Sequence, residues 1–231
     1  MFIKNHIFQL CEPTRFWPAT SEQRAASEAF NIAPDHRSPM RTSPSFFPDA
    51  VLASFIPIFL IRHPALVIES WYKAESCVEP ASIFVQTWAI PKGFELSRKL
   101  HDWYLARCPD RWERNVGPGP FHPIVVEADD ILEQSVIPKL CEMCNMDPRQ
   151  VPSEWNTKAR TNDRHLWAKM RGLWTSTRID KSRTSKGLNM EDKYQQWKNE
   201  FGLAIADRFL EYVRNDMEDY LYLKARKVEA I

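Results

Sequence analysis

An uninterrupted apolar run at residues 55–61 is the strongest constraint on how this chain folds. Side chains of a strand alternate between its two faces, so a run without alternation is typical of a strand buried on both faces in a parallel sheet. Arg62-His63-Pro64 follows the run directly, and proline is favoured in the first turn of a helix. We therefore predict a strand, an arginine at its carboxyl end and a helix over residues 64–74.

The rest of the chain continues this alternation of strands and helices. The predicted strands are Phe2–Phe8 and Pro123–Glu127, and the predicted helices are Phe94–Arg107, a segment from Asp129 or Asp130 to about Met143, and Met190 to about Leu223. Residues 154–171 fit no single class, and residues 175–189 are polar and basic, as in a surface loop. The pattern predicts one α/β domain over residues 1–231 with a mostly parallel sheet, an irregular insertion at 9–50 and a helical region at 190–231.

Charge and composition exclude several classes of partner. Lys and Arg number 31 against 30 Asp and Glu, so the net charge of +1 gives no reason to expect nucleic acid or a membrane surface. The longest apolar run, residues 53–61, is far shorter than the roughly 20 residues of a membrane helix. The five cysteines form no disulfide framework, and we expect a cytoplasmic protein with reduced thiols.

Two further motifs invite a chemical interpretation that we do not favour. Cys141 and Cys144 have the spacing of a metal or redox pair, but they lie in a predicted helix without a second ligand pair, so we predict thiols on one helix face and no metal. Asp129 and Asp130 follow a strand and precede a helix, where a helix cap is expected rather than acid–base chemistry. His63 is expected to shape the turn after the first strand.

Three short segments carry residues suited to group transfer. Lys4 and His6 lie on one face of the first predicted strand. Arg62 at a strand end can offer its planar fork to a phosphate, and Ser70 stands eight positions later in the following helix. The segment Thr184-Ser185-Lys186-Gly187 precedes Trp197-Lys198-Asn199-Glu200-Phe201. The basic loop from Arg178 to Lys186 is either a phosphate clamp or a solvated loop.

Together these segments resemble the cytosolic sulfotransferases. The stretch 59–64 with Ser70 resembles their 3′-phosphate-binding segment, Lys4-x-His6 their K-x-H strand, and residues 184–187 their C-terminal nucleotide-binding loop. The blocks 100–104, 124–130 and 197–202 are similar to fungal sulfotransferase-like proteins. The resemblance covers nearly the whole chain and implies a P-loop NTPase-like α/β fold.

The resemblance also implies a reaction and a set of site residues. The donor would be 3′-phosphoadenosine 5′-phosphosulfate and the acceptor a small-molecule hydroxyl or amine. His6 would be the general base, with Lys4 stabilising negative charge beside it. Arg62 and Ser70 would bind the 3′-phosphate. The residues expected to bind the nucleotide from the C-terminal loop are Arg183, Lys186 and Gly187.

Two departures from the family pattern are visible. In the family a strand, a phosphosulfate-binding loop and a helix precede the K-x-H strand, whereas this chain starts at that strand, so we expect the first βα unit to be missing. The uncovered sheet edge would then favour self-association as a homo-oligomer. In addition, Ser185 stands where the family has an arginine, and Arg178 and Arg183 are candidates to replace it.

Three functional hypotheses remain open from the sequence. The first is a sulfotransferase-like enzyme acting on a small-molecule hydroxyl in fungal secondary metabolism. The second is a cofactor-independent acid–base enzyme, such as a cyclase, isomerase or dehydratase, in the same pocket. The third is a non-catalytic remnant or partner protein, in which Arg62 is a structural ion-pair residue and His6 an ordinary strand residue.

Overall fold

The structure is a computed structural model that describes residues 7–10, 42–77, 93–107, 122–158 and 161–229. Two compact units make up the chain. The first contains Met1–Phe59 and Ala89–Ile124, and the second contains Leu60–Trp88 and Val125–Ile231. The candidate site lies in the second unit.

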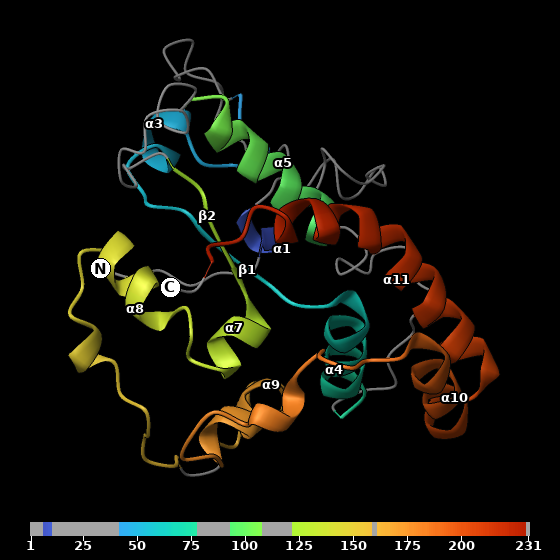
Figure 1. Ribbon diagram of the computed structural model, residues 1–231. Helices are drawn as coiled ribbons and strands as arrows, with labels where there is room; N and C mark the ends of the chain where they lie inside the picture. The colour runs from blue at the N-terminus through green and yellow to red at the C-terminus, as the bar shows by residue number, and fades with distance from the viewer. Residues whose placement is uncertain (1–6, 11–41, 78–92, 108–121, 159–160, 230–231) are drawn as a thin grey trace. The chain divides into compact units, whose positions relative to one another are not determined.

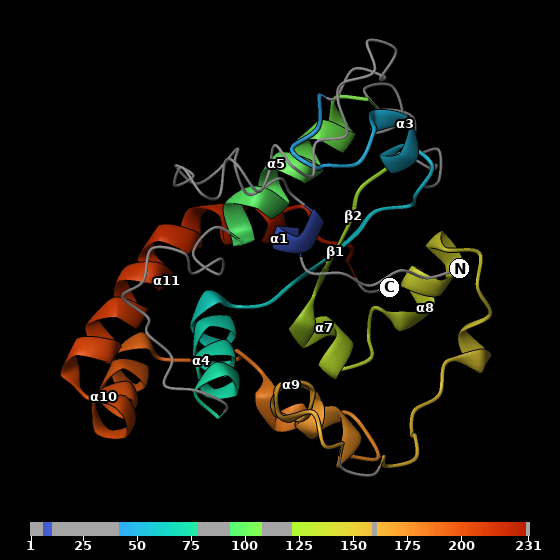
Figure 2. The ribbon, with the colours of Figure 1, turned by 180° about the vertical axis from the view of Figure 1, so that it is seen from behind.

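Two short strands form the sheet of the described residues. β1 (Ile58–Ile61) pairs with β2 (Ile124–Glu127) in parallel. The amide of Ile124 donates to the carbonyl of Pro57 at 2.9 Å. Figure 2 shows β1 leading into one helix and β2 into another at the same end of the sheet. The predicted α/β class is therefore confirmed, and the carboxyl ends of both strands meet at one edge.

The burial of β1 corrects one expectation. Phe59 and Ile61 are buried, but Ile58 is 37% exposed and Leu60 is 59% exposed, so only one face of the strand is buried. The apolar run was expected to be buried on both faces. Alternating burial is what a strand with one face against the core produces, and the apolar composition of this strand did not distinguish the two cases. All four residues of β2, in contrast, are buried.

The helix after β1 is the centre of packing in the second unit. α4 (Pro64–Ser76) starts with Pro64 in its first turn, as predicted, and it packs against α9 (Arg164–Trp174) and α11 (Leu203–Lys224). Figure 1 shows α11 in turn beside α10 (Met190–Phe201). The fully buried Trp197 donates its indole N–H to Glu69 of α4 at 3.1 Å, which fixes α10 against α4.

The segment after β2 is broken into two helices rather than one. α7 (Ala128–Leu132) begins directly after the strand, and α8 (Ile137–Met143) follows a turn in which Gln134 has a φ of 61°. The single helix predicted up to Met143 was wrong because Pro138 cannot donate a helical hydrogen bond and so lies in a new first turn. The structure also shows Cys141 buried in α8 and Cys144 half-buried at its carboxyl end.

The C-terminal region forms two helices whose junction is a glycine. Gly202 has a φ of 88°, a left-handed conformation that glycine adopts without strain, and it separates α10 from α11. Beyond α11, the amide of Val228 donates to the carbonyl of Val125 at 2.8 Å, and Lys227 forms a parallel bridge with Val125. The end of the described chain thus runs beside β2.

The first unit contains α1 (Ile7–Leu10), α3 (Asp49–Leu52) and α5 (Gly93–Leu105). The predicted helix at residues 94–107 is confirmed, and Tyr104 of α5 donates its hydroxyl to the carbonyl of Leu52 at 2.8 Å. The predicted strand at residues 2–8 was wrong for its last two residues, which lie in α1. Its other residues lie outside the described ranges. Strand-like alternation over so few residues also fits the first turn of a helix.

Segments between these helices complete the described chain. Within the ambiguous residues 154–171, α9 accounts for the part from Arg164 onward. The predicted loop at 175–189 contains one 3₁₀ turn, η4 (Lys181–Arg183). A second 3₁₀ turn, η3 (Pro148–Gln150), follows α8. No helix in the described ranges is both long and apolar enough to cross a membrane.

Candidate functional site

Arg62 joins the end of β1 to the basic loop. Its side chain is half-buried directly after the strand, and its Nη2 donates to the backbone carbonyl of Arg183 at 3.0 Å. Burial lowers the pKa of the Arg62 guanidinium, and the positive charge of Arg183 lowers it further, against the opposing charges of Asp129 and Glu69. Two guanidinium groups therefore repel each other at this edge of the sheet, and an anion bound there would relieve that repulsion.

A second set of contacts ties the same loop to the helix after β2. Asp129, in the first turn of α7, accepts the backbone N–H of Ser185 at 2.9 Å and also its hydroxyl. Lys186 pairs with Glu133 just beyond α7. Burial alone would raise the pKa of Asp129, but the hydrogen bonds from Ser185 keep it below the ordinary value. The loop is thus fastened to the carboxyl ends of both strands.

Asp129 corrects the predicted helix cap. Glu127 is the residue that precedes α7, and neither it nor Asp129 caps the helix with its side chain. The carboxylate of Asp129 is instead 6% exposed and directed to the basic loop. Two acidic residues directly before a predicted helix indicated a helix cap. The carboxylate of Asp129 instead accepts hydrogen bonds from Ser185, which lies 56 positions away in the sequence.

His63 shapes the turn, as the sequence indicated. Its Nδ1 accepts the backbone N–H of Ala65 at 3.2 Å and so caps α4, which places the ring proton on Nε2. Burial lowers the pKa of His63, and nearby Lys224 lowers it further, while Glu127 and Asp129 oppose them. The ring edge also meets Tyr220 at a centroid distance of 5.5 Å. A neutral imidazole therefore caps the helix that follows Arg62.

The other predicted site residues have different surroundings. Ser70 lies about two turns into α4 with its side chain exposed. Gly187 has a φ of 72°, and a side chain there would meet nothing within 4 Å. Arg183 pairs with Asp180 at 3.0 Å. Lys4 and His6 lie outside the described residues, so their roles stay predictions.

A buried acidic network beside the site was not singled out from the sequence. Glu127, at the end of β2, is 2% exposed, accepts the hydroxyl of Tyr220 and lies 2.9 Å from the ammonium of Lys224. Lys227 lies 3.6 Å from Glu127 and 2.6 Å from Asp130. Burial raises the pKa of Tyr220, and the charge of Glu127 raises it further. The available signal was a charged residue ending an apolar strand together with Tyr220 and Lys224 one helical turn apart.

This edge of the sheet carries side chains suited to bind an anion. In the described ranges no three His, Cys, Asp or Glu side chains come together as metal ligands. Arg62, Arg183 and Lys186 instead bring three cationic side chains to one loop and one strand end. Guanidinium groups recognise phosphate through paired, charge-assisted hydrogen bonds.

Comparison with known proteins decides the family. The chain is 31% identical over 252 aligned positions to a protein named sulfotransferase ppzF from Metarhizium majus (strain ARSEF 297), and the alignment covers 100% of this chain and 70% of that protein. The chain belongs to the sulfotransferase family. The predicted resemblance to the sulfotransferases is therefore confirmed at the level of the family.

A second relative with the same name also matches the whole of this chain. The sulfotransferase ppzF of Metarhizium rileyi (strain RCEF 4871) is 29% identical over 252 positions, again over 100% of this chain and 70% of the relative. Both relatives come from fungi, and the chain spans about 70% of the length of each. No family model and no solved structure matches the chain.

Proposed function

We propose that this chain is a sulfotransferase-like enzyme that transfers the sulfo group of 3′-phosphoadenosine 5′-phosphosulfate to a small-molecule hydroxyl in fungal secondary metabolism. The acceptor oxygen forms a new bond to sulfur, and the bond between sulfur and the 5′-phosphate oxygen breaks. His6 takes the hydroxyl proton, Lys4 stabilises the negative charge, and 3′,5′-diphosphoadenosine leaves. The fold proposed for this reaction is of the P-loop NTPase-like type.

The observation that carries the proposal is the hydrogen bond from Arg62 to the carbonyl of Arg183. It brings together two segments, 121 positions apart, that the family resemblance assigns to the same nucleotide. The bond uses one N–H of the Arg62 guanidinium, which has five N–H donors. The remaining donors of Arg62 can therefore bind the 3′-phosphate while the loop stays in place.

Other residues of the proposed phosphate site act through charge and backbone. Ser70 is exposed on α4 and offers a hydroxyl donor. Lys186 is paired with the exposed Glu133, and an ion pair at the surface contributes little, so its ammonium can turn to a phosphate at small cost. Gly187 allows the left-handed turn that the loop makes after Lys186. We assign no residue of this chain to the 5′-phosphosulfate.

Isothermal titration calorimetry with 3′,5′-diphosphoadenosine tests the proposal. We expect a dissociation constant on the order of 1–10 µM for the wild-type chain. Arg62→Ala removes a charge-assisted contact and should weaken binding by about 10- to 100-fold. Arg149→Ala is the matched control, because Arg149 is exposed and pairs only with Asp147 among the described residues.

The absence of binding by the wild-type chain would overturn this proposal. That result would leave the cofactor-independent acid–base hypothesis, in which the acceptor pocket works without a donor. Equal binding by the wild type and Arg62→Ala would show that the nucleotide binds elsewhere. Circular dichroism of each variant checks that the fold is retained.

A further inference from the structure

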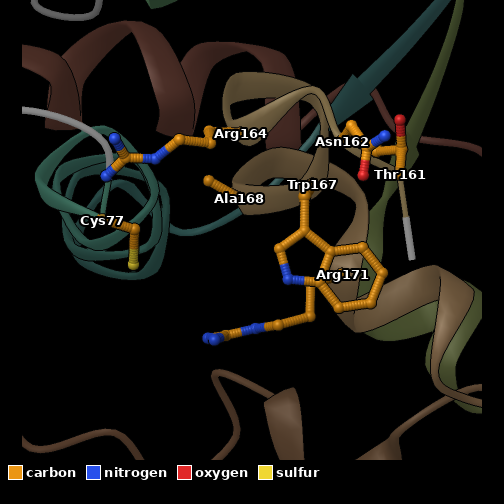
Figure 3. A pocket seen from close by; sticks show the side chains of 7 residues that line it. All are labelled: Cys77, Thr161, Asn162, Arg164, Trp167, Ala168 and Arg171. Carbon is orange, nitrogen blue, oxygen red and sulfur yellow. The ribbon is translucent and has the colours of Figure 1, made fainter.

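A cavity of about 600 Å³ lies between the carboxyl end of α4 and the first turns of α9. Its volume falls within the range of small-molecule pockets, roughly 300–1,000 Å³. Figure 3 shows Arg164 reaching from α9 toward the end of α4 that carries Cys77, with Trp167 and Arg171 also extending from α9. All the lining residues belong to the second unit.

The end of this cavity at Cys77 lies far from Arg62. Arg62 stands just before α4, and Cys77 stands just after it. A helix of 13 residues is about 20 Å long, because each residue adds about 1.5 Å. A ligand beside Cys77 therefore does not reach the guanidinium of Arg62. The other end of the cavity, at Arg171, adjoins Gly172, which lies against the guanidinium of Arg183.

The charged groups of the cavity are two arginines on one face of α9. Arg164 and Arg171 are seven positions apart, which is close to two helical turns, and Trp167 lies on the same face between them. Both arginine side chains are exposed, and no carboxylate of the described residues forms an ion pair with either. The neighbouring Asp163 uses its carboxylate to cap α9, accepting the N–H of Leu166 at 2.9 Å.

Trp167 supplies the aromatic surface between these charges. Its side chain is half-buried, and its ring lies 6.2 Å from the ring of Trp174, about two helical turns farther along α9. A ring supported on one side by another ring presents a firm surface to a planar ligand. Thr161 and Asn162 add a hydroxyl and an amide at the start of α9.

We propose that this cavity binds a planar aromatic anion. The ring of the ligand lies against Trp167, and its sulfate or carboxylate group binds the guanidinium of Arg164 or Arg171. Cys77 lies at the rim, where a bound ligand shields its thiol. This binding requires neither the nucleotide nor the transfer reaction.

The first experiment is calorimetry with 1-naphthyl sulfate, with the uncharged 1-naphthol as its matched partner. We expect a dissociation constant on the order of 0.1 mM for the sulfate. Arg164→Gln or Arg171→Gln, whichever removes the guanidinium that binds the sulfate, should weaken its binding by about tenfold through the loss of a charge-assisted contact. Arg149→Gln is the control for the loss of a surface charge and should bind as the wild type does.

Alkylation of Cys77 by N-ethylmaleimide gives an independent readout. Peptide mass spectrometry follows Cys77, with the half-buried Cys144 as the internal reference. Saturating 1-naphthyl sulfate should slow the alkylation of Cys77 by about tenfold and leave Cys144 unchanged, since a ligand bound about nine-tenths of the time leaves the thiol open for the remainder. Trp167→Leu should abolish the protection, while Trp167→Phe should retain most of it.

Three results would overturn the proposal. Equal binding of 1-naphthol and its sulfate would show that the arginines play no part. Unchanged binding in both arginine variants and in Trp167→Leu would place the ligand elsewhere. Competition by 3′,5′-diphosphoadenosine would make the cavity part of the nucleotide site, whereas failure of that nucleotide to bind at all, with 1-naphthyl sulfate still bound, would contradict only the proposed function.

Discussion

The carboxylate of Asp129 holds Ser185 by two hydrogen bonds, one from its backbone N–H and one from its hydroxyl. Ser185 stands where the family resemblance places an arginine, so a neutral donor has replaced a cation at this point. The backbone N–H and the hydroxyl of Ser185 provide hydrogen bonds to the buried carboxylate of Asp129. The loop is therefore attached to α7 through a neutral residue.

Removing this attachment should destabilise the loop measurably. Asp129→Ala leaves two donors of Ser185 without their acceptor and should cost about 1.5–3 kcal/mol in the free energy of unfolding, because hydrogen bonds to charged groups are the stronger ones. Urea unfolding at neutral pH measures the difference. Ser182→Ala is the control, since Ser182 donates to Asp180 in a fully exposed pair and should change stability little. A loss in Asp129→Ala no larger than in the control would contradict this account.

The pKa of Asp129 adds a pH dependence to the same contact. Its folded pKa lies below the ordinary value of 3.8, so the stabilisation is complete above that value and is lost as the pH falls through the folded pKa. Urea unfolding of wild type and Asp129→Asn should therefore differ most at neutral pH, with the gap closing in acid below about pH 4. A gap that stays constant down to pH 3 would show that the charge of Asp129 is not involved.

His63 should make stability fall as the solution is acidified. Its folded pKa is lower than the unfolded value of 6.5, so below about pH 6.5 the unfolded chain takes up a proton that the folded chain does not. His63→Asn keeps a capping side chain but cannot titrate, and it should reduce the loss of unfolding free energy between about pH 8 and pH 5. His63→Ala lacks both the cap and the titrating group, so it should lose about 1 kcal/mol at about pH 8, and this difference from the wild type should shrink as the pH falls. An unchanged pH slope in His63→Asn would contradict the assignment.

Tyr220→Phe should be one of the costlier hydroxyl deletions in the chain. Tyr220 is 1% exposed and donates to Glu127, which is itself buried, so the carboxylate would lose a donor away from water. We expect a loss of about 1–3 kcal/mol in urea unfolding. Tyr194→Phe is the matched control, because the hydroxyl of Tyr194 donates to Asp207 in an exposed pair. Equal losses in the two variants would show that burial of the network is unimportant.

Gly172 and Gly187 should respond oppositely to alanine. Gly187 has a φ of 72°, so Gly187→Ala should lose about 1–2 kcal/mol through the backbone alone. Gly172 lies inside α9, and a Cβ there would contact the guanidinium of Arg183 at 3.4 Å, an ordinary contact distance. Gly172→Ala should therefore gain up to about 1 kcal/mol from helix propensity. Thermal unfolding of both variants decides the signs, and a stabilised Gly187→Ala would refute the backbone argument.

Local pattern predicted the elements of this fold better than it predicted their contacts. The apolar run before Arg62 and the proline at position 64 indicated β1 and α4, because both signals act within a few residues. The same kind of signal missed the break before Pro138 and suggested a strand where α1 begins. Short segments satisfy two periodicities at once, and packing then decides between them.

The site was predictable in part for a similar reason. Arg62 and Arg183 were named from family-like motifs, and the structure brings them into contact. The partners of Asp129 and Glu127 were not foreseen, since they lie 56 and 93 positions away in the sequence. Hydrophobic periodicity identifies which residues are buried, but it gives no information on which distant polar group will pair with a buried carboxylate.

A thermodynamic cycle between Arg62 and the 3′-phosphate tests the central claim most directly. Calorimetry measures 3′,5′-diphosphoadenosine and adenosine 5′-monophosphate against the wild type and Arg62→Ala. The account predicts that Arg62→Ala weakens the diphosphate by about 10- to 100-fold and the monophosphate by less than about twofold, a coupling of about 1.5–3 kcal/mol. Equal weakening of both nucleotides, and hence no coupling, would contradict it.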